Sequence, residues 1–188
     1  MMLIDRYIPI FQFKEKHEIF VNVSPGILLD ASMRPETMDD PWARTFIRLR
    51  EFPGRLAGAL GGVSELKNRP AFGFNNFVLL GRDGDRELAL GLAGKFWQSD
   101  YGLATVDSAE EFERFDEQGI AKLVLNISTE IVSDGRTKLM TETRVFCNDR
   151  KSIIRFTPYW WLIRPVSGLI RRRLLTRILS TAVTSNQN

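Results

Sequence analysis

The segment IIRFTPYWWLIRPVSGLIRRRLLTRILSTA, residues 153–182, decides the fold of this chain. One set of side chains recurs in it at spacings of three, four or seven residues, which places them on one stripe of an α-helix. The set consists of Phe156, Trp160, Ile163, Ile170, Leu174, Ile178 and Thr181. A helix of this length would reach roughly 45 Å, more than the width of most small domains. We therefore expect the rest of the chain to wrap around it.

The prolines of this segment bear on where the helix begins and on its shape. The helix begins either near Ser152, or with Thr157 as N-cap and Pro158 as the first helical residue. Pro165 is expected to kink the helix, because its ring removes one backbone hydrogen bond and clashes with the preceding turn.

Alternation of apolar and polar residues predicts strands with one buried face over much of the preceding chain. The pattern covers residues 11–23, 120–132 and 138–147. A hairpin is predicted at residues 77–97, with its turn at Asp83-Gly84-Asp85. Two short helices are predicted after the first strand, opening at Ser24-Pro25 and at Asp40-Pro41.

Together these elements predict an α+β fold, in which a curved antiparallel sheet wraps around the long C-terminal helix. At 188 residues the chain is expected to be one domain. We place its core at residues 10–182 and expect residues 184–188 to be disordered.

Glu142 and Arg144 share one face of their strand. They are either solvated or paired with neighbouring strands on the convex face, or a buried ion pair able to orient a polar ligand.

Composition indicates an ordinary soluble globule, with 44% apolar and 26% charged residues. A single cysteine, Cys147, excludes an intramolecular disulfide. The N-terminal residues show no signal peptide and no run approaches the roughly 20 apolar residues of a membrane span, so a cytoplasmic protein is predicted.

The net charge of +3 is distributed unevenly, because residues 150–188 contain eight arginines and lysines and no acid. This basic end either contacts an anionic membrane through Arg171, Arg172 and Arg173, or complements the helix dipole and pairs with acids of the body. Nucleic-acid binding is not expected, because aromatic and basic residues do not interleave on one strand face.

Catalytic chemistry is restricted by the presence of one histidine, His17, and one cysteine. A Ser-His-Asp or Cys-His arrangement would have to use His17. One histidine and one cysteine cannot build a usual zinc site, and no phosphate-binding or dinucleotide-binding glycine motif is present. We therefore predict no metal and no cofactor.

The order of elements and four local phrases resemble the helix-grip superfamily (SRPBCC), which includes START lipid-transfer domains, birch-pollen-allergen-type proteins and polyketide cyclase and dehydrase-like proteins. The phrases are VNVSP at 21–25, GLAGKFW at 91–97, TETRV at 141–145 and YWWLIRP at 159–165. They are most similar to bacterial members with no assigned activity. The resemblance implies a helix-grip fold whose sheet and last helix enclose a cavity for a small, largely apolar molecule.

Three functions are weighed on this basis. The first is binding of a small hydrophobic ligand such as a lipid or polyketide, with no reaction assigned. The second is a cyclase-like or dehydrase-like enzyme in which His17, Thr141 and Thr143 polarise a carbonyl. The third is a module that binds a lipid surface or a protein partner through its basic helix. The candidate cavity residues are His17, Trp97, Leu123, Leu125, Ile127, Thr141, Thr143, Trp160 and Ile163.

Overall fold

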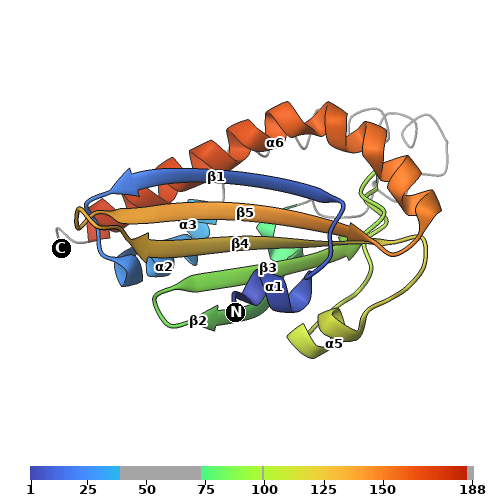
Figure 1. The fold of residues 1–188 in the computed structure, drawn as a ribbon, viewed down its shortest axis with the longest axis horizontal. Helices are drawn as coiled ribbons and strands as arrows, with labels where there is room; N and C mark the ends of the chain where they lie inside the picture. Colours follow the sequence, from blue (N-terminus) through green and yellow to red (C-terminus); the bar gives the residue numbers. More distant parts are fainter. Residues whose placement is uncertain (39–72, 99, 186–188) are drawn as a thin grey trace.

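The computed structural model describes residues 1–38, 73–98 and 100–185 (Figure 1). The helix predicted to open at Asp40-Pro41 lies outside the described residues. The described helices are α1 (Leu3–Tyr7), α2 (Pro25–Ser32), α3 (Pro35–Met38), the 3-10 helix η2 (Phe74–Asn76), α5 (Ala109–Arg114) and α6 (Arg150–Ser185). The described strands are β1 (Phe13–Val21), β2 (Val78–Asp83), β3 (Glu87–Gly94), β4 (Ala121–Ile131) and β5 (Thr137–Cys147).

These strands form one antiparallel sheet of five strands, in the order β1-β5-β4-β3-β2 within the described residues. Figure 1 shows the sheet with α6 lying along one side of it. The α+β class, the antiparallel sheet and the long C-terminal helix are therefore confirmed. The hairpin predicted around Asp83-Gly84-Asp85 is the β2–β3 pair.

The register of the sheet places the predicted inward side chains on one face. His17 on β1 lies opposite Thr141 on β5, and Thr141 lies opposite Ile127 on β4. The same face continues through Leu125, which lies opposite Leu90 on β3. Leu125 and Ile127 pack with residues of α6, so this is the face that the helix covers.

Two apolar clusters attach α6 to this face. Near the C-terminal end of the helix, Leu174, Leu175 and Ile178 pack with α2 and with β3, β4 and β5. Near its N-terminal end, Phe156 and Trp160 pack with β4, β5 and the end of β3. Burying a side chain of this size stabilises a fold by about 1.5–3 kcal/mol, so both ends of α6 are firmly held.

The opposite face of the sheet is covered by α1 and α5. Ile4 and Tyr7 of α1 pack there with Phe112 of α5 and Val124 of β4. The sequence gives no signal for α1, because five residues are too few to show a helical period. The core therefore begins before residue 10, where the sequence analysis placed its start.

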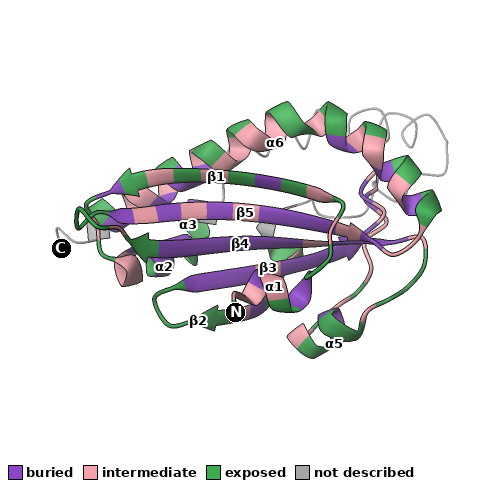
Figure 2. Cartoon of the chain, viewed as in Figure 1, coloured by how far each residue is buried: buried purple, intermediate pink, exposed green. Residues whose placement is uncertain are grey.

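Glu142 and Arg144 lie on this opposite face, away from α6. Arg144 is buried, and it donates hydrogen bonds to Asp5 Oδ1 at 2.8 Å, Ile8 O at 3.2 Å and Glu142 Oε1 at 2.7 Å. The pair therefore lies away from the helix-covered face and is paired with the neighbouring strand through Lys14, as one alternative had it, but α1 shields the arginine from solvent. Figure 2 shows how much of β4 and β5 is buried.

α6 begins at Arg150, close to the predicted start near Ser152, and Asp149 caps it. Asp149 Oδ1 accepts a hydrogen bond from Ser152 N at 2.9 Å, and Asp149 Oδ2 accepts one from Gly119 N at 2.7 Å. These bonds lower the pKa of Asp149 to about 2, with the Ser152 hydroxyl as the first contributor. Pro158 lies inside the helix, so it does not begin it.

Pro165 also lies inside α6, and Figure 1 shows the helix arched over the sheet rather than straight. Proline removes a hydrogen bond inside a helix and favours such bending. At the other end, α6 includes Thr184 and Ser185, where the sequence analysis expected a disordered end. Residues 186–188 lie outside the described residues.

Candidate functional site

The polar part of the interior lies beneath the middle of α6, between the two apolar clusters. On the sheet it consists of Glu15 and His17 of β1 and of Thr141 and Thr143 of β5. Glu15 lies opposite Thr143, and His17 lies opposite Thr141. Glu15 is 8% exposed, Thr141 1% and Thr143 2%, so three polar side chains are buried where apolar ones would be expected.

These side chains satisfy one another only in part. His17 Nε2 lies 2.8 Å from Glu15 Oε1, which is hydrogen-bond distance. Glu15 Oε2, Thr141 Oγ1 and Thr143 Oγ1 are buried and have no hydrogen-bond partner in the described part of the chain. A buried polar atom without a partner costs about 1–3 kcal/mol, so native proteins rarely retain one without a reason.

Two residues of α6 complete the site from the opposite side. A Cβ atom on Gly168 would lie 2.9 Å from Glu15 Oε1 and 3.5 Å from His17 Nε2, so glycine lets the helix come close to this pair. Arg171 lies one turn further along and is half-buried, and its Nε is buried with no hydrogen-bond partner among the described residues. Burial lowers the pKa of Arg171 to about 10, against the opposing attraction of Glu15.

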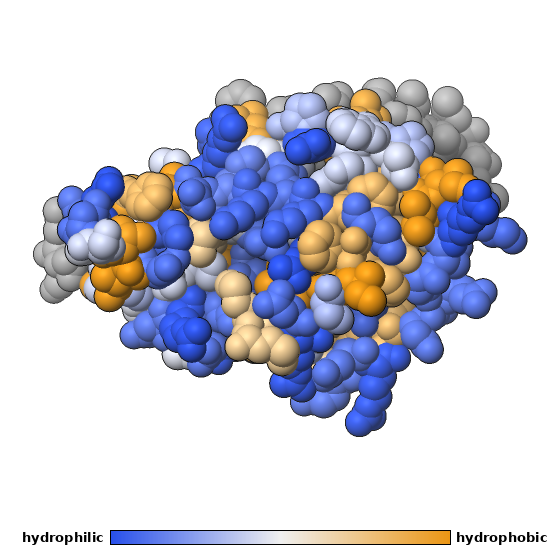
Figure 3. All heavy atoms as spheres, viewed as in Figure 1, coloured by the Kyte–Doolittle hydropathy of each residue, from blue (hydrophilic) through white to orange (hydrophobic). Residues whose placement is uncertain are grey.

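A cleft of about 630 Å³ opens from this polar centre between β1 and α6. Glu15, His17 and Gly168 line its inner part. Its remaining lining combines the cations Lys14, Lys16, Arg164 and Arg172 with the apolar Trp161, Pro165 and Leu169. Figure 3 shows hydrophilic side chains gathered along this side of the molecule, beneath the middle of α6. We call it the β1–α6 cleft.

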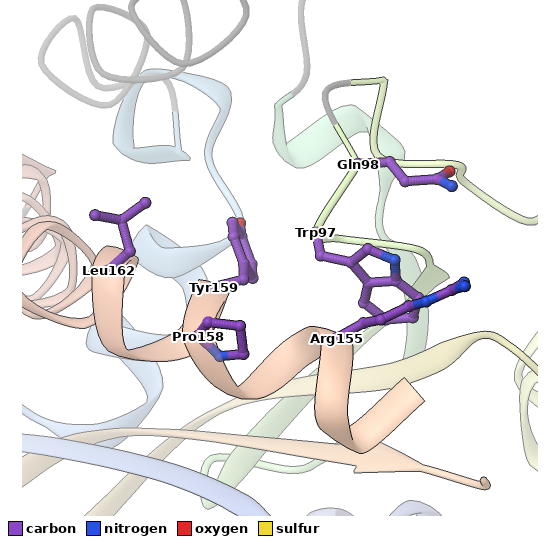
Figure 4. A pocket seen from close by; sticks show the side chains of 6 residues that line it. All are labelled: Trp97, Gln98, Arg155, Pro158, Tyr159 and Leu162. Atoms are coloured by element: carbon purple, nitrogen blue, oxygen red, sulfur yellow. The ribbon is translucent and has the colours of Figure 1, made fainter. Parts of the chain in front are cut away.

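A second cleft, of about 660 Å³, lies beside the N-terminal part of α6 (Figure 4). It is lined by Trp97, Gln98, Arg155, Pro158, Tyr159 and Leu162. Trp97 contacts Phe156 edge to face, with 6.4 Å between the ring centroids, so the indole is partly engaged in the apolar cluster. This cleft has no buried unpaired atom among its lining residues.

Of the nine predicted cavity residues, only His17 and Trp97 line one of these two clefts, and they line different ones. Thr141 and Thr143 lie on the sheet face next to His17 and Glu15. The other five pack in or beside the apolar clusters or are half-buried on α6: Leu123, Leu125, Ile127, Trp160 and Ile163. Leu125 and Ile127 are fully buried in the cluster that holds the C-terminal end of α6.

His17 and Cys147 are not a pair. His17 lies opposite Thr141, and Cys147 is six residues further along β5, or roughly 20 Å at about 3.4 Å per residue. Cys147 is buried, and burial raises the pKa of its thiol to about 12. The structure therefore leaves no Cys-His nucleophile.

Sequence reasoning missed Glu15, Gly168 and Arg171 as site residues. Glu15 carried a signal, because it is an acid on the strand face that also carries Phe13 and Ile19. Gly168 carried a weaker one, as a glycine in the middle of a long helix. Arg171 carried no signal beyond its place in the basic run, because the local sequence does not tell which way its side chain turns.

The three consecutive arginines do not form one surface. Arg172 is exposed, whereas Arg171 and Arg173 are half-buried, and Arg171 faces Glu15 closely enough for the carboxylate to affect its pKa. No helix in the described ranges is long and apolar enough to cross a membrane. Within the same ranges, no three His, Cys, Asp or Glu side chains lie close enough together to hold a metal ion.

Comparisons with models of protein families, with curated proteins and with solved structures find no match for this chain.

Proposed function

We propose that this chain is a helix-grip domain that binds a small molecule with an apolar body and a polar group in the β1–α6 cleft. The arrangement of an antiparallel sheet beneath a long C-terminal helix supports the helix-grip assignment. The mixed lining supports the ligand, because small-molecule sites combine apolar walls with a few polar groups that orient the guest. Trp161, Pro165 and Leu169 supply the apolar wall.

One observation carries this proposal, the set of buried polar atoms without partners beneath the middle of α6. The hydroxyls of Thr141 and Thr143 and one oxygen of Glu15 need partners that the described chain does not supply. An apolar residue at each position would have given a continuous core from Phe156 to Ile178. Of these three residues Glu15 lines the cleft itself, so a polar guest there could supply a hydrogen-bond partner for its carboxylate, while the two threonines lie next to it on the sheet.

Native mass spectrometry of the protein purified from its own host tests the proposal. We expect a population heavier than the bare chain by the mass of one small molecule. Gly168→Leu should abolish it, because even the first side-chain carbon would lie 2.9 Å from Glu15 Oε1. Thr176→Leu is the matched control, since it adds the same side chain at an exposed position of the same helix.

Loss of the bound mass in both leucine variants, or its retention in Gly168→Leu, would contradict a ligand in this cleft. A bare chain in every sample, at concentrations where the fold is intact by circular dichroism, would contradict ligand binding altogether.

A second candidate function is catalysis on the bound molecule, favoured by the 2.8 Å approach of His17 Nε2 to Glu15 Oε1. A carboxylate that orients a histidine is a common feature of general bases, and the threonine hydroxyls lie on the adjacent strand. The test is to incubate the molecule recovered from wild type with fresh wild type and with His17→Gln. Conversion by wild type alone supports catalysis, and an unchanged molecule in both samples leaves binding as the function.

Contact with an anionic membrane is a third candidate, favoured by exposed apolar side chains on α6. Trp161 is 64% exposed and Leu162 78%, and Trp161 contacts the exposed cation Arg164. Aromatic and basic residues combined in this way favour a lipid interface. When phosphatidylserine vesicles are sedimented, wild type should pellet with them, and Trp161→Ser/Leu162→Ser should stay in the supernatant. Equal binding of both proteins would exclude this surface.

A further inference from the structure

The charges around the β1–α6 cleft do not balance. Lys14 Nζ lies 3.1 Å from Glu142 Oε1, and Lys16 Nζ lies 3.6 Å from Glu18 Oε2, so both lysines already have carboxylate partners. Arg164 and Arg172 line the cleft and have no carboxylate within ion-pair distance among the described residues. The lining of the cleft contains one carboxylate, that of Glu15, and the same carboxylate also acts on the pKa of Arg171.

The geometry of α6 directs two of these arginines toward the same place. Arg164, Gly168 and Arg172 are spaced by four residues, so they lie on one face of the helix. The Cα atoms of Arg164 and Arg172 are about 12 Å apart at about 1.5 Å per residue, a gap that two arginine side chains can close from both sides. Gly168 between them has no side chain, which lets the helix backbone approach Glu15 and His17 at the inner end of the cleft.

The apolar residues of the cleft lie on the same helix turns. Trp161 packs against Arg164, with the guanidinium carbon 5.7 Å from the ring centroid, and Leu169 follows Gly168 directly. A guest held by the arginines would therefore lie with its remaining part against an apolar wall. Both arginines are exposed to water, so a purely apolar guest would make no use of them, and a small inorganic anion would leave the apolar wall uncovered.

We propose that the ligand of the β1–α6 cleft is an amphiphile with an anionic head, a carboxylate or a phosphate monoester, held by Arg164 and Arg172. This inference rests on the proposed function, since it names the chemical class of the molecule that the cleft binds. Arginine suits both heads because its planar guanidinium donates paired hydrogen bonds to two oxygens. Glu15 and His17 line the inner end of the cleft and would face the part of the molecule nearest the sheet.

Titration calorimetry with probes that share one tail tests the inference. The probes are laurate, dodecyl phosphate and the neutral dodecanol, each below its micelle or solubility limit. We expect at least one of the two anions to bind wild type roughly tenfold or more tightly than dodecanol, the effect of about one good ion pair. The anion that binds more tightly identifies the head.

The matched variants separate this cleft from other basic surfaces. Arg164→Gln/Arg172→Gln should bring the anion to the affinity of the alcohol. Arg150→Gln/Arg155→Gln removes the same charge from exposed positions of the same helix and should change the preference less than about twofold. Because Arg155 lines the other cleft, a preference lost in this control instead would place the anion there and overturn the inference.

The outcomes also separate this inference from the proposed function. Equal affinity of wild type for dodecanol and both anions would overturn the anionic head and leave a ligand-binding cleft. No binding of any probe by wild type would overturn both. A preference that persists unchanged in Arg164→Gln/Arg172→Gln would show that these arginines do not hold the head.

Discussion

Arg171→Met should make the ligand-free protein more stable, although it removes a charged residue of the site. Burial lowers the pKa of Arg171 from 12.5 to about 10. Because each pKa unit corresponds to about 1.4 kcal/mol, the charged side chain costs the folded state up to about 3 kcal/mol at pH 7. Methionine keeps most of the side-chain volume without the charge, and such replacements of buried charges are often stabilising by about 1–4 kcal/mol.

The assay is equilibrium urea unfolding of wild type, Arg171→Met and Arg172→Met after refolding without ligand. Arg172 is exposed, so its variant should lie within about 0.5 kcal/mol of wild type. The gain in the free energy of unfolding of Arg171→Met over wild type should be complete below pH 10 and should shrink as the pH rises from 10 toward 12.5. The sign follows because the folded state disfavours the protonated arginine, and that penalty disappears once both states lose the proton. An Arg171→Met variant less stable than wild type by more than about 1 kcal/mol would refute the reasoning.

Three further outcomes are expected. Asp149→Ala should lower the urea midpoint of unfolding by removing the N-cap of α6, and a midpoint that matches wild type would show that the cap contributes nothing. Cys147 should resist a thiol reagent at pH 8 in the native protein and react in urea, because burial raises its pKa to about 12; rapid native labelling would contradict its burial. Phe156→Ala should cost about 3–5 kcal/mol in the same unfolding assay, and a loss below about 1 kcal/mol would mean that the N-terminal end of α6 is not anchored there.

The sheet and the long helix could be predicted because each carries a strong local period. Strand alternation has a period of two, so one correct position fixes the face of every other residue, as it did for His17, Ile127 and Thr141. The stripe from Phe156 to Ile178 likewise fixed which side of α6 meets the sheet. The short α1 gave no comparable signal, because its burial comes from contacts with β2, β3 and β4 that are distant in sequence.

The site was predicted less completely than the fold, because it depends on what lies across from each residue. His17, Thr141 and Thr143 were named from strand parity, and the register does bring them together. The convergence of Glu15 with Gly168 and Arg171 depends on how far α6 slides along β1, which no local pattern encodes. For the same reason Leu125 and Ile127 were expected to line a cavity, whereas α6 and α2 pack directly onto them.

The most direct test of a guest beneath the middle of α6 is a crystal structure of the protein purified from its own host. We predict electron density for one elongated molecule between β1 and α6, within hydrogen-bond distance of Arg164 or Arg172 and in contact with Trp161. A cleft closed by the protein's own side chains, with the hydroxyls of Thr141 and Thr143 bonded only within the chain, would contradict the account.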